Sequence, residues 1–184
     1  MPVRSLLFLA LVTIAACGGA GSETGESSGT VESSASVVPS TDLQPVGVQP
    51  QGFTTITARI TKADGEVCEV CLWLADDAAE RGRGLMGVTD LGEPSGMAFR
   101  FEEAVNGNFF MFQTPTPLSI AWFAPDGSIV GVADMDPCLE TNYADCERYS
   151  PGSLYSLVIE TFEGDLADLG IGPGSVVQMV EGSE

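Results

Sequence analysis

The 184-residue chain has room for one folded domain with attached segments, and its 26 Asp and Glu against 7 Lys and Arg give it a formal charge of −19. This charge repels nucleic acid and anionic lipid head groups, which excludes binding to either through a charged surface and leaves neutral or cationic ligands as the easier partners. The absence of histidine from the sequence excludes Ser-His-Asp and Cys-His nucleophiles and every His-based zinc or copper site.

The first residues have the pattern of an export signal. Arg4 precedes an apolar run, residues 6–16, that is too short for a permanent membrane span. The small residues Ala15 and Ala16 stand directly before Cys17, an arrangement that resembles the lipobox of bacterial lipoproteins. The resemblance implies removal of the signal peptide, residues 1–16, acylation of Cys17, and anchoring in the cell envelope outside the cytoplasm. An ordinary signal followed by an incidental cysteine is the alternative.

A tether and one domain are expected after the signal. Residues 18–50 are rich in Gly, Ser, Thr and Glu and contain no basic residue and no hydrophobic periodicity. Such a segment cannot bury enough apolar surface to fold, so residues 17–50 are predicted to be a lipidated, disordered tether with a span of about 30 Å. The change of composition at Gln51 predicts a single β-rich domain over residues 51–184, which we expect to be monomeric.

Alternation of apolar and polar residues predicts the first strands, at residues 53–61, 67–75 and 97–101. The first two are joined by a hairpin turn at residues 62–65. Asp76 and Asp77 stand where N-cap acceptors belong, and a short helix over residues 78–83 follows them. The acidic start and basic end of this helix agree with its dipole.

The middle of the chain holds two apolar runs, which predict strands at residues 108–113 and 118–124. They are joined by a bend at Pro115 and Pro117, because no central strand could carry these prolines. This hairpin is the expected centre of the core. The remaining elements are expected at residues 128–133, 154–161 and 175–180 as strands and at 165–169 as a helical turn. Eight short strands with two helical pieces predict a mostly β fold, a compact sandwich or partly closed barrel.

Four cysteines follow Cys17, and an even number in an exported chain indicates disulfides. Cys138 and Cys146 bracket a short polar loop and are predicted to close it, which would stabilise the fold by about 2.5 kcal/mol through loop entropy. Cys68 and Cys71 are three residues apart, so in a regular strand they point to opposite faces. We predict a Cys68–Cys71 bond, which needs a bulge or turn, and crossed pairing with Cys138 and Cys146 is the alternative.

Several short motifs follow one another along the domain. They are Ala75-Asp76, Glu80-Arg81, Arg83-Gly84-Leu85-Met86, Gly96-Met97-Ala98-Phe99, Phe109-Phe110-Met111, Gln113-Thr114, Pro117-Leu118, Asp126-Gly127 and Leu169-Gly170-Ile171-x-Pro173-Gly174. This series resembles the domain of unknown function family 192, small and often exported bacterial and archaeal domains, over about residues 56–180. The resemblance implies a small, mostly β fold and no established activity.

The chain departs from this family pattern at the bend. Where the family has Trp-Met-Lys-Asn-Thr and then Pro-Leu-Asp, this sequence reads Phe110-Met111-Phe112-Gln113-Thr114 and Pro117-Leu118-Ser119. A lysine and an acid are therefore missing from the polar cluster that the family would place here. Gln113 can still donate and accept hydrogen bonds, but catalysis that depends on those charges is not carried over to this chain.

The family-like motifs meet around the bend, at the ends of strands where loops carry function. We therefore expect a ligand site there, formed by Arg81, Arg83, Gly84, Met86, Met97, Met111, Gln113, Thr114 and Pro117. Arg81 and Arg83 could clamp a carboxylate or sulfate in a fork. Alternatively, they form local ion pairs with Asp76, Asp77 or Glu80.

The sequence offers two candidate kinds of metal site, but no metal or other cofactor is expected. Four methionines could offer thioethers to Cu(I), but methionine also fills gaps in small cores; they are Met86, Met97, Met111 and Met135. The acids of the loop over residues 134–147 could bind Ca²⁺, but their order does not match an EF-hand loop.

The leading hypothesis is a lipid-tethered, non-enzymatic binding module for a neutral or cationic small ligand, a glycan or an envelope protein. An envelope hydrolase is a second hypothesis, and it requires two carboxylates that converge in a cleft. Metal handling, through thioethers or through the acidic loop, is the third.

Overall fold

The computed structural model describes residues 47–180. The predictions that concern residues 1–46, namely the signal peptide, the lipidated Cys17 and most of the tether, lie outside the described residues, as do residues 181–184. Within the described part of the chain, no helix is both long enough and apolar enough to cross a membrane.

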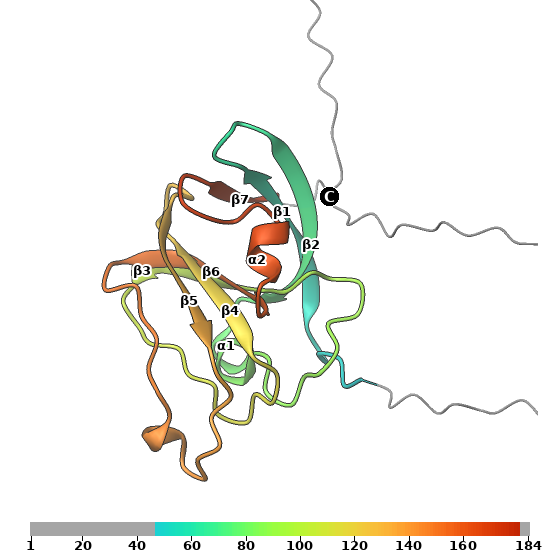
Figure 1. The fold of residues 1–184 in the computed structure, drawn as a ribbon, viewed down its shortest axis with the longest axis vertical. Helices are drawn as coiled ribbons and strands as arrows, with labels where there is room; N and C mark the ends of the chain where they lie inside the picture. Colours follow the sequence, from blue (N-terminus) through green and yellow to red (C-terminus); the bar gives the residue numbers. More distant parts are fainter. Residues whose placement is uncertain (1–46, 181–184) are drawn as a thin grey trace, which may run out of the picture.

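The described residues form one curled β-sheet with two short α-helices (Figure 1). The strands are β1 (Thr54–Thr61), β2 (Val67–Ala75), β3 (Met97–Val105), β4 (Leu118–Phe123), β5 (Ile129–Met135), β6 (Tyr155–Phe162) and β7 (Val176–Val180). They lie in the order β5-β4-β6-β3-β2-β1-β7. A single bridge between Ser128, just before β5, and Val176 of β7 joins the two ends of the sheet at one point. The predicted mostly β fold, a sandwich or partly closed barrel, is confirmed.

Local sequence signals account for the N-terminal hairpin and the helices. β1 and β2 pair antiparallel from Thr54–Leu74 to Thr61–Val67, and the Lys62 amide donates to the Glu66 carbonyl oxygen across the turn. The helix α1 (Ala78–Arg83) has the bounds that its capping signals predict. The helix α2 (Asp165–Asp168) is the predicted single turn, and a short 3-10 helix covers Tyr143–Asp145.

The run at residues 108–113 is not a strand, so the prediction of an eighth strand paired in a hairpin with β4 is wrong. β4 has β5 on one side and β6 on the other, which leaves it no edge for a third partner. Residues 108–113 instead cross the sheet face and make only isolated bridges, Phe109 with Tyr149 and Phe112 with Cys138. The segment ends at Gln113, whose φ of 56° is incompatible with an extended strand.

All six residues of β4 are buried, as expected for the centre of the core. Alternate side chains point to opposite faces of a sheet, so β4 serves two apolar clusters. Ala121 and Phe123 belong to the first cluster, with the apolar residues of β1 and α2. Leu118, Ile120 and Trp122 belong to the second cluster, on the face covered by α1 and by the segment at residues 108–113.

The pairing of β2 with β3 is parallel, which the sequence analysis did not anticipate. Trp73–Ala75 lies beside Met97–Phe99, and the long connection between the strands carries α1. Gly96 stands at the start of β3, where its carbonyl oxygen accepts from the Trp73 amide. A Cβ atom at this glycine would lie 2.3 Å from the backbone oxygen of Glu160 on β6. Only glycine therefore allows β3 to approach both neighbours.

We expect Gly96→Ala to lower the free energy of unfolding by about 1–3 kcal/mol, the usual cost of forcing extra volume into a packed interior. Urea unfolding measures the change. The matched control is Gly82→Ala in α1, where a new Cβ meets nothing within 4 Å. Because alanine is the better helix former, the control should stabilise by about 0.5–1 kcal/mol. Equal effects of the two substitutions would contradict this packing.

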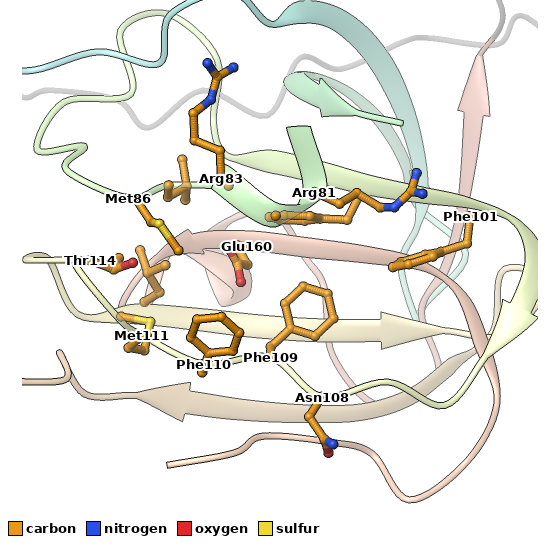
Figure 2. A pocket seen from close by; sticks show the side chains of 15 residues that line it. Arg81, Arg83, Met86, Phe101, Asn108, Phe109, Phe110, Met111, Thr114 and Glu160 are labelled. Atoms are coloured by element: carbon orange, nitrogen blue, oxygen red, sulfur yellow. The ribbon is translucent and has the colours of Figure 1, made fainter. Parts of the chain in front are cut away.

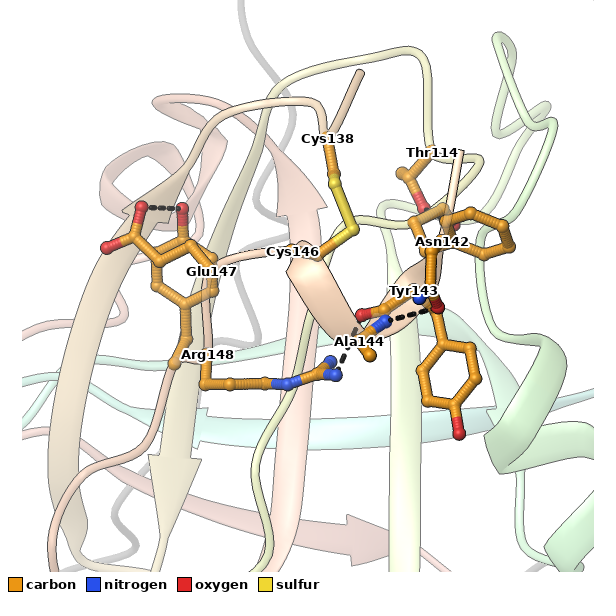
Figure 3. The surroundings of a disulfide bond; sticks show 10 residues. Thr114, Cys138, Asn142, Tyr143, Ala144, Cys146, Glu147 and Arg148 are labelled. Carbon is orange, nitrogen blue, oxygen red and sulfur yellow. Dashed lines mark hydrogen bonds between the residues drawn. A yellow bond between two sulfur atoms is a disulfide. The ribbon is translucent and has the colours of Figure 1, made fainter. Parts of the chain in front are cut away.

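The disulfide predictions have mixed outcomes. Cys138 and Cys146 are bonded, which confirms the closed loop (Figure 3). Cys71 is an exposed free thiol, so the predicted Cys68–Cys71 bond is wrong, and the bond between Cys138 and Cys146 excludes the crossed alternative. The reason is the regularity of β2, in which Cys68 points into the core with 1% exposure while Cys71 points to solvent.

Val48 and Gln49 contact the connection between α1 and β3. The amide of Val48 donates to the Thr89 hydroxyl, and its carbonyl oxygen accepts from the amides of Thr89 and Asp90. The Gln49 side chain also donates to the Asp90 carboxylate. These hydrogen bonds hold Val48 and Gln49, which fall within the predicted tether, against Thr89 and Asp90.

Candidate functional site

The helix α1 forms one side of the candidate site and is fixed at both ends. Asp77 accepts the Glu80 amide at 2.8 Å, and Glu80 accepts the Asp77 amide, which together make a capping box. At the other end Gly84 has a φ of 47°, which glycine adopts at little cost, and its amide donates to the Glu80 carbonyl oxygen. This turn brings residues 84–86 back over the sheet.

A cavity of about 280 Å³ lies between α1, the β3-β6-β4 part of the sheet and the segment at residues 108–114 (Figure 2). Its lining consists of Arg81, Gly82, Arg83, Gly84, Leu85, Met86, Phe99, Phe101, Asn108, Phe109, Phe110, Met111, Thr114, Leu118 and Glu160. Of these, Gly82, Arg83 and Asn108 are exposed, which marks where the cavity meets solvent. The wall is mainly aromatic rings, thioethers and leucine side chains.

Glu160 is the one acidic residue in this lining. It lies on β6 between Met97 of β3 and Ile120 of β4, both fully buried, and is itself only 5% exposed. Within residues 47–180 its carboxyl group has no ion pair and no side-chain hydrogen bond. Burial alone raises the pKa of this carboxyl from 4.5 to about 8, so the group is mostly protonated at neutral pH.

Arg81 is held in the wall by backbone contacts. Its guanidinium donates to the carbonyl oxygens of Asp76 and of Arg100, the latter at 3.0 Å, and lies 4.9 Å from the Phe101 ring centre. The Asp76 carboxylate is instead paired with Arg100 at 2.7 Å. Arg81 therefore joins the end of β2 to β3. The sequence suggested either an anion clamp or a local ion pair for Arg81, and the side chain forms neither of them within residues 47–180.

Arg83 points away from the cavity floor. Its guanidinium lies 4.1 Å from the ring centre of Phe53, and Figure 2 shows it directed away from Glu160 and from Arg81. The two guanidinium groups do not converge, so no fork for a carboxylate or sulfate is formed between them. Burial raises the pKa of Glu160, and neither arginine lowers it, which agrees with the separation of both guanidinium groups from this carboxyl group.

The disulfide loop supports the outer wall of the cavity. Phe110 lies under the Arg148 guanidinium at 4.5 Å, and its ring centre is 6.1 Å from that of Tyr143. Arg148 in turn donates to the Tyr143 carbonyl oxygen (Figure 3). On the inner side, Phe109 packs edge-on against Phe99 with ring centres 5.3 Å apart. The segment at residues 108–112 is therefore held from both sides.

The structure brings six of the nine expected site residues into one cavity, namely Arg81, Arg83, Gly84, Met86, Met111 and Thr114. The other three lie outside its lining. Met97 is fully buried in the core, and Gln113 is an exposed turn residue whose carbonyl oxygen accepts from Gly87. The Pro117 carbonyl oxygen accepts from the Glu163 amide, so this residue positions the start of β4.

The residue that the sequence analysis missed is Glu160. It is the only charged side chain in the apolar run of residues 157–162, Leu-Val-Ile-Glu-Thr-Phe. Alternation places it on the same face as Val158, which belongs to the second apolar cluster. A lone acid on the buried face of a strand is a signal that could have been used. The aromatic lining was also not predicted: Phe99 lies on β3, as expected, but Phe109 and Phe110 lie outside any strand and reach the cavity from the segment at residues 108–113.

The alternative sites find less support in the described residues. No group of three or more His, Cys, Asp or Glu within residues 47–180 is placed to hold a metal ion. Met86 and Met111 line the cavity, whereas Met97 and Met135 are enclosed in the core. A hydrolase of the two-carboxylate type needs a second acid, and Glu160 is the single acid of this cavity.

The comparisons with known proteins agree with this fold. The family model described as DUF192, Uncharacterized ACR, matches residues 59–179. A crystal structure of a candidate transcription regulator from Sinorhizobium meliloti 1021 is similar, with a TM-score of 0.60 and 24% identity over 69% of this chain and 95% of that one. A protein of unknown function from Novosphingobium aromaticivorans has a TM-score of 0.58 and 27% identity, over 72% of this chain and 92% of the other. No curated protein matches the chain.

Proposed function

The chain belongs to the DUF192 family, and we propose that its domain is a binding module that holds a small ligand in the cavity beside α1. The observation that carries the proposal is a preformed, mainly apolar cavity with a single carboxyl group, that of Glu160, which is 5% exposed and has no ion pair among residues 47–180. Ligand sites typically combine apolar walls with a few polar groups that fix orientation. A buried polar group without a partner also costs stability, so it is seldom kept without a role.

The size and wall of the cavity favour a small ligand over a glycan chain or an envelope protein. A cavity of about 150 Å³ accommodates benzene, so 280 Å³ has room for one ring with a short chain. The polar side chains that a sugar would need are few here, because Thr114 donates to the Phe112 carbonyl oxygen and Asn108 lies at the mouth. The description of the Sinorhizobium protein as a regulator is not transferred, because a charge of −19 opposes contact with nucleic acid.

We further propose that the module acts outside the cytoplasm, anchored through a lipid on Cys17 and monomeric. The lipobox-like residues before Cys17 support the anchor, and the bonded pair Cys138–Cys146 supports an oxidising compartment. Mass spectrometry of the protein extracted from membranes measures the modification directly. An N-terminal peptide that begins at Cys17 and carries acyl chains is expected, and an intact Met1 terminus without acylation would contradict the anchor.

Filling the cavity should abolish binding without unfolding the domain. Met86 is half-buried and its side chain points toward Glu160 in Figure 2, so Met86→Trp places an indole in the space of the ligand. A library of small aromatic and aliphatic fragments, followed by saturation-transfer NMR on the full-length protein, is expected to give hits with the wild type that the variant loses. Met179→Trp, at a half-buried methionine of β7 outside this cavity, is the matched control and should keep the hits. Hits that survive in Met86→Trp would place the binding site elsewhere.

A further inference from the structure

We propose that the ligand of this cavity is a protonated primary amine with a small apolar or aromatic body, whose ammonium group pairs with the Glu160 carboxylate. This inference rests on the proposed function and adds the chemical class of the ligand. It comes from the charges and walls that surround Glu160.

The cavity contains a buried acid that has no counter-ion in the part of the chain that the structure describes. Arg81 and Arg83 are the only other charged side chains in the lining, and both come from α1. Arg81 is occupied by two backbone carbonyl oxygens, and Arg83 is stacked on Phe53. The other elements around Glu160, namely β3, β4 and the segment at residues 108–114, add no charged side chain to the lining. Among residues 47–180 no side chain supplies a positive charge to the Glu160 carboxyl group, so we assign that charge to a ligand.

An ammonium group matches this acceptor in number and kind of hydrogen bonds. An ionised carboxylate only accepts, and an ammonium only donates, with three donors. Hydrogen bonds between such charged partners are shorter and stronger than those between neutral groups. A neutral ligand would leave the carboxyl group protonated and could offer it an acceptor, but it would leave the second oxygen without a donor.

The walls fit the rest of a cationic, partly apolar molecule and disfavour an anion. The rings of Phe99, Phe109 and Phe110 offer negative faces to a cation, and the thioethers of Met86 and Met111 are polarizable. The lining offers an anionic ligand few free donors, because the Arg81 guanidinium and the Thr114 hydroxyl already donate to carbonyl oxygens. An anion would also meet a Glu160 carboxylate or force it to stay protonated.

The whole molecule reinforces the choice of a cation. A charge of −19 enriches cations near the surface, and a cleft with low-dielectric walls concentrates that field. The space of about 280 Å³ limits the body of the amine to roughly one ring with a two-carbon chain. We therefore take 2-phenylethylamine as the probe and 2-phenylethanol, which is matched in shape and uncharged, as its control.

Proton linkage gives the proposal a distinctive readout. Because the pKa of Glu160 lies at about 8 in the unliganded protein, ammonium binding at pH 7 must displace the carboxyl proton. Calorimetry in two buffers of different ionisation enthalpy should show release of about 0.9 proton for each amine bound at pH 7. The association constant should rise roughly tenfold per pH unit between pH 6 and pH 7 and level off above pH 8, until the amine itself loses its proton. A neutral ligand would give no proton release.

The experiment uses the full-length protein, both probes and the variants Glu160→Gln and Met86→Trp. We expect the wild type to bind the amine at pH 8 at least about tenfold more tightly than the alcohol, and Glu160→Gln to lose this preference. Equal binding of the two probes, amine binding that Glu160→Gln leaves unchanged, or binding without proton release would overturn the inference. The proton count is measured on the wild type, so the test does not depend on the folding of Glu160→Gln.

The outcomes separate this inference from the proposed function. If the alcohol binds as well as the amine and Met86→Trp blocks both, the cavity is a ligand site of another class and only the amine is wrong. If Met86→Trp leaves every hit of the fragment library in place, the proposed function fails together with the inference. If the cavity binds other fragments but not the amine at pH 8, the inference alone is refuted.

Discussion

Glu160→Gln is expected to make the protein more stable than the wild type at alkaline pH and nearly unchanged in stability at pH 5. The pKa of Glu160 is about 8 in the folded chain and 4.5 when the group is solvated. Between these values the folded state binds one proton more than the unfolded state, so stability falls as pH rises, by about 1.4 kcal/mol per pH unit. Well above pH 8 Glu160 is ionised in both the folded and the unfolded state, so the free energy of unfolding falls no further. From pH 5 to pH 9 the loss reaches about 4 kcal/mol.

The measurement is urea unfolding of the wild type and Glu160→Gln at several values between pH 5 and pH 9. Only the difference between the two proteins is interpreted, because the pH dependence of the other groups is then shared. Glu103→Gln, at an exposed position of β3, is the matched control and should follow the wild type throughout. A constant difference between Glu160→Gln and the wild type over this range would show that Glu160 is solvated or paired.

Trp122→Ala should be among the most destabilising substitutions in the chain, with a loss of about 3–5 kcal/mol. The side chain is 1% exposed in β4, packs edge-on against Phe109 with ring centres 6.2 Å apart, and belongs to the cluster beneath the cavity. Its removal leaves a large void that the two neighbouring strands cannot close. Chemical denaturation of the variant at neutral pH gives the loss.

Trp122→Phe provides an informative comparison. The indole Nε1 of Trp122 is buried and has no hydrogen-bond partner among residues 47–180. Burying such a donor costs roughly 1–3 kcal/mol, so phenylalanine loses packing area but removes this penalty. We therefore expect Trp122→Phe to cost well under half of what Trp122→Ala costs. A loss as large as that of the alanine variant would mean that the indole N–H is satisfied in solution.

The parts of the fold that were predicted well are those set by neighbouring residues. The bounds of β2 and α1 agree with the prediction to the residue, because alternation, the capping residue Asp77 and the Gly-rich stop at Gly82 and Gly84 are all local signals. The turn at residues 62–65 is likewise encoded in its own sequence. Each of these signals acts within a few residues, so no knowledge of distant contacts is needed.

The errors concern relations between distant segments. Residues 108–113 contain an apolar run like that of a buried strand, yet β5 and β6 occupy both edges of β4 and leave this segment no partner. The parallel pairing of β2 with β3 is also invisible in either strand alone. For the cysteines, the predicted Cys68–Cys71 bond needed a bulge or turn, and the regular pleat of β2 provides neither.

In the candidate site, too, the residues within local motifs were predicted and the residue that depends on distant segments was not. The motifs around Gly84-Leu85-Met86 and Met111, which carry the family resemblance, pointed to the cavity, and their side chains do converge in its lining. Glu160 lies in no such motif, and its role depends on its position between Met97 and Ile120 on neighbouring strands. Strand order therefore had to be known before this acid could be recognised as part of the site.

The carboxyl group of Glu160 can be followed directly by NMR in protein labelled with ¹³C at the glutamate side chains, with Glu160→Gln to assign its signal. In the unliganded protein the signal should titrate with a midpoint at about pH 8, and saturating 2-phenylethylamine should move that midpoint to lower pH. A midpoint near the ordinary value of 4.5 in the unliganded protein would contradict the buried, unpaired acid on which the site depends.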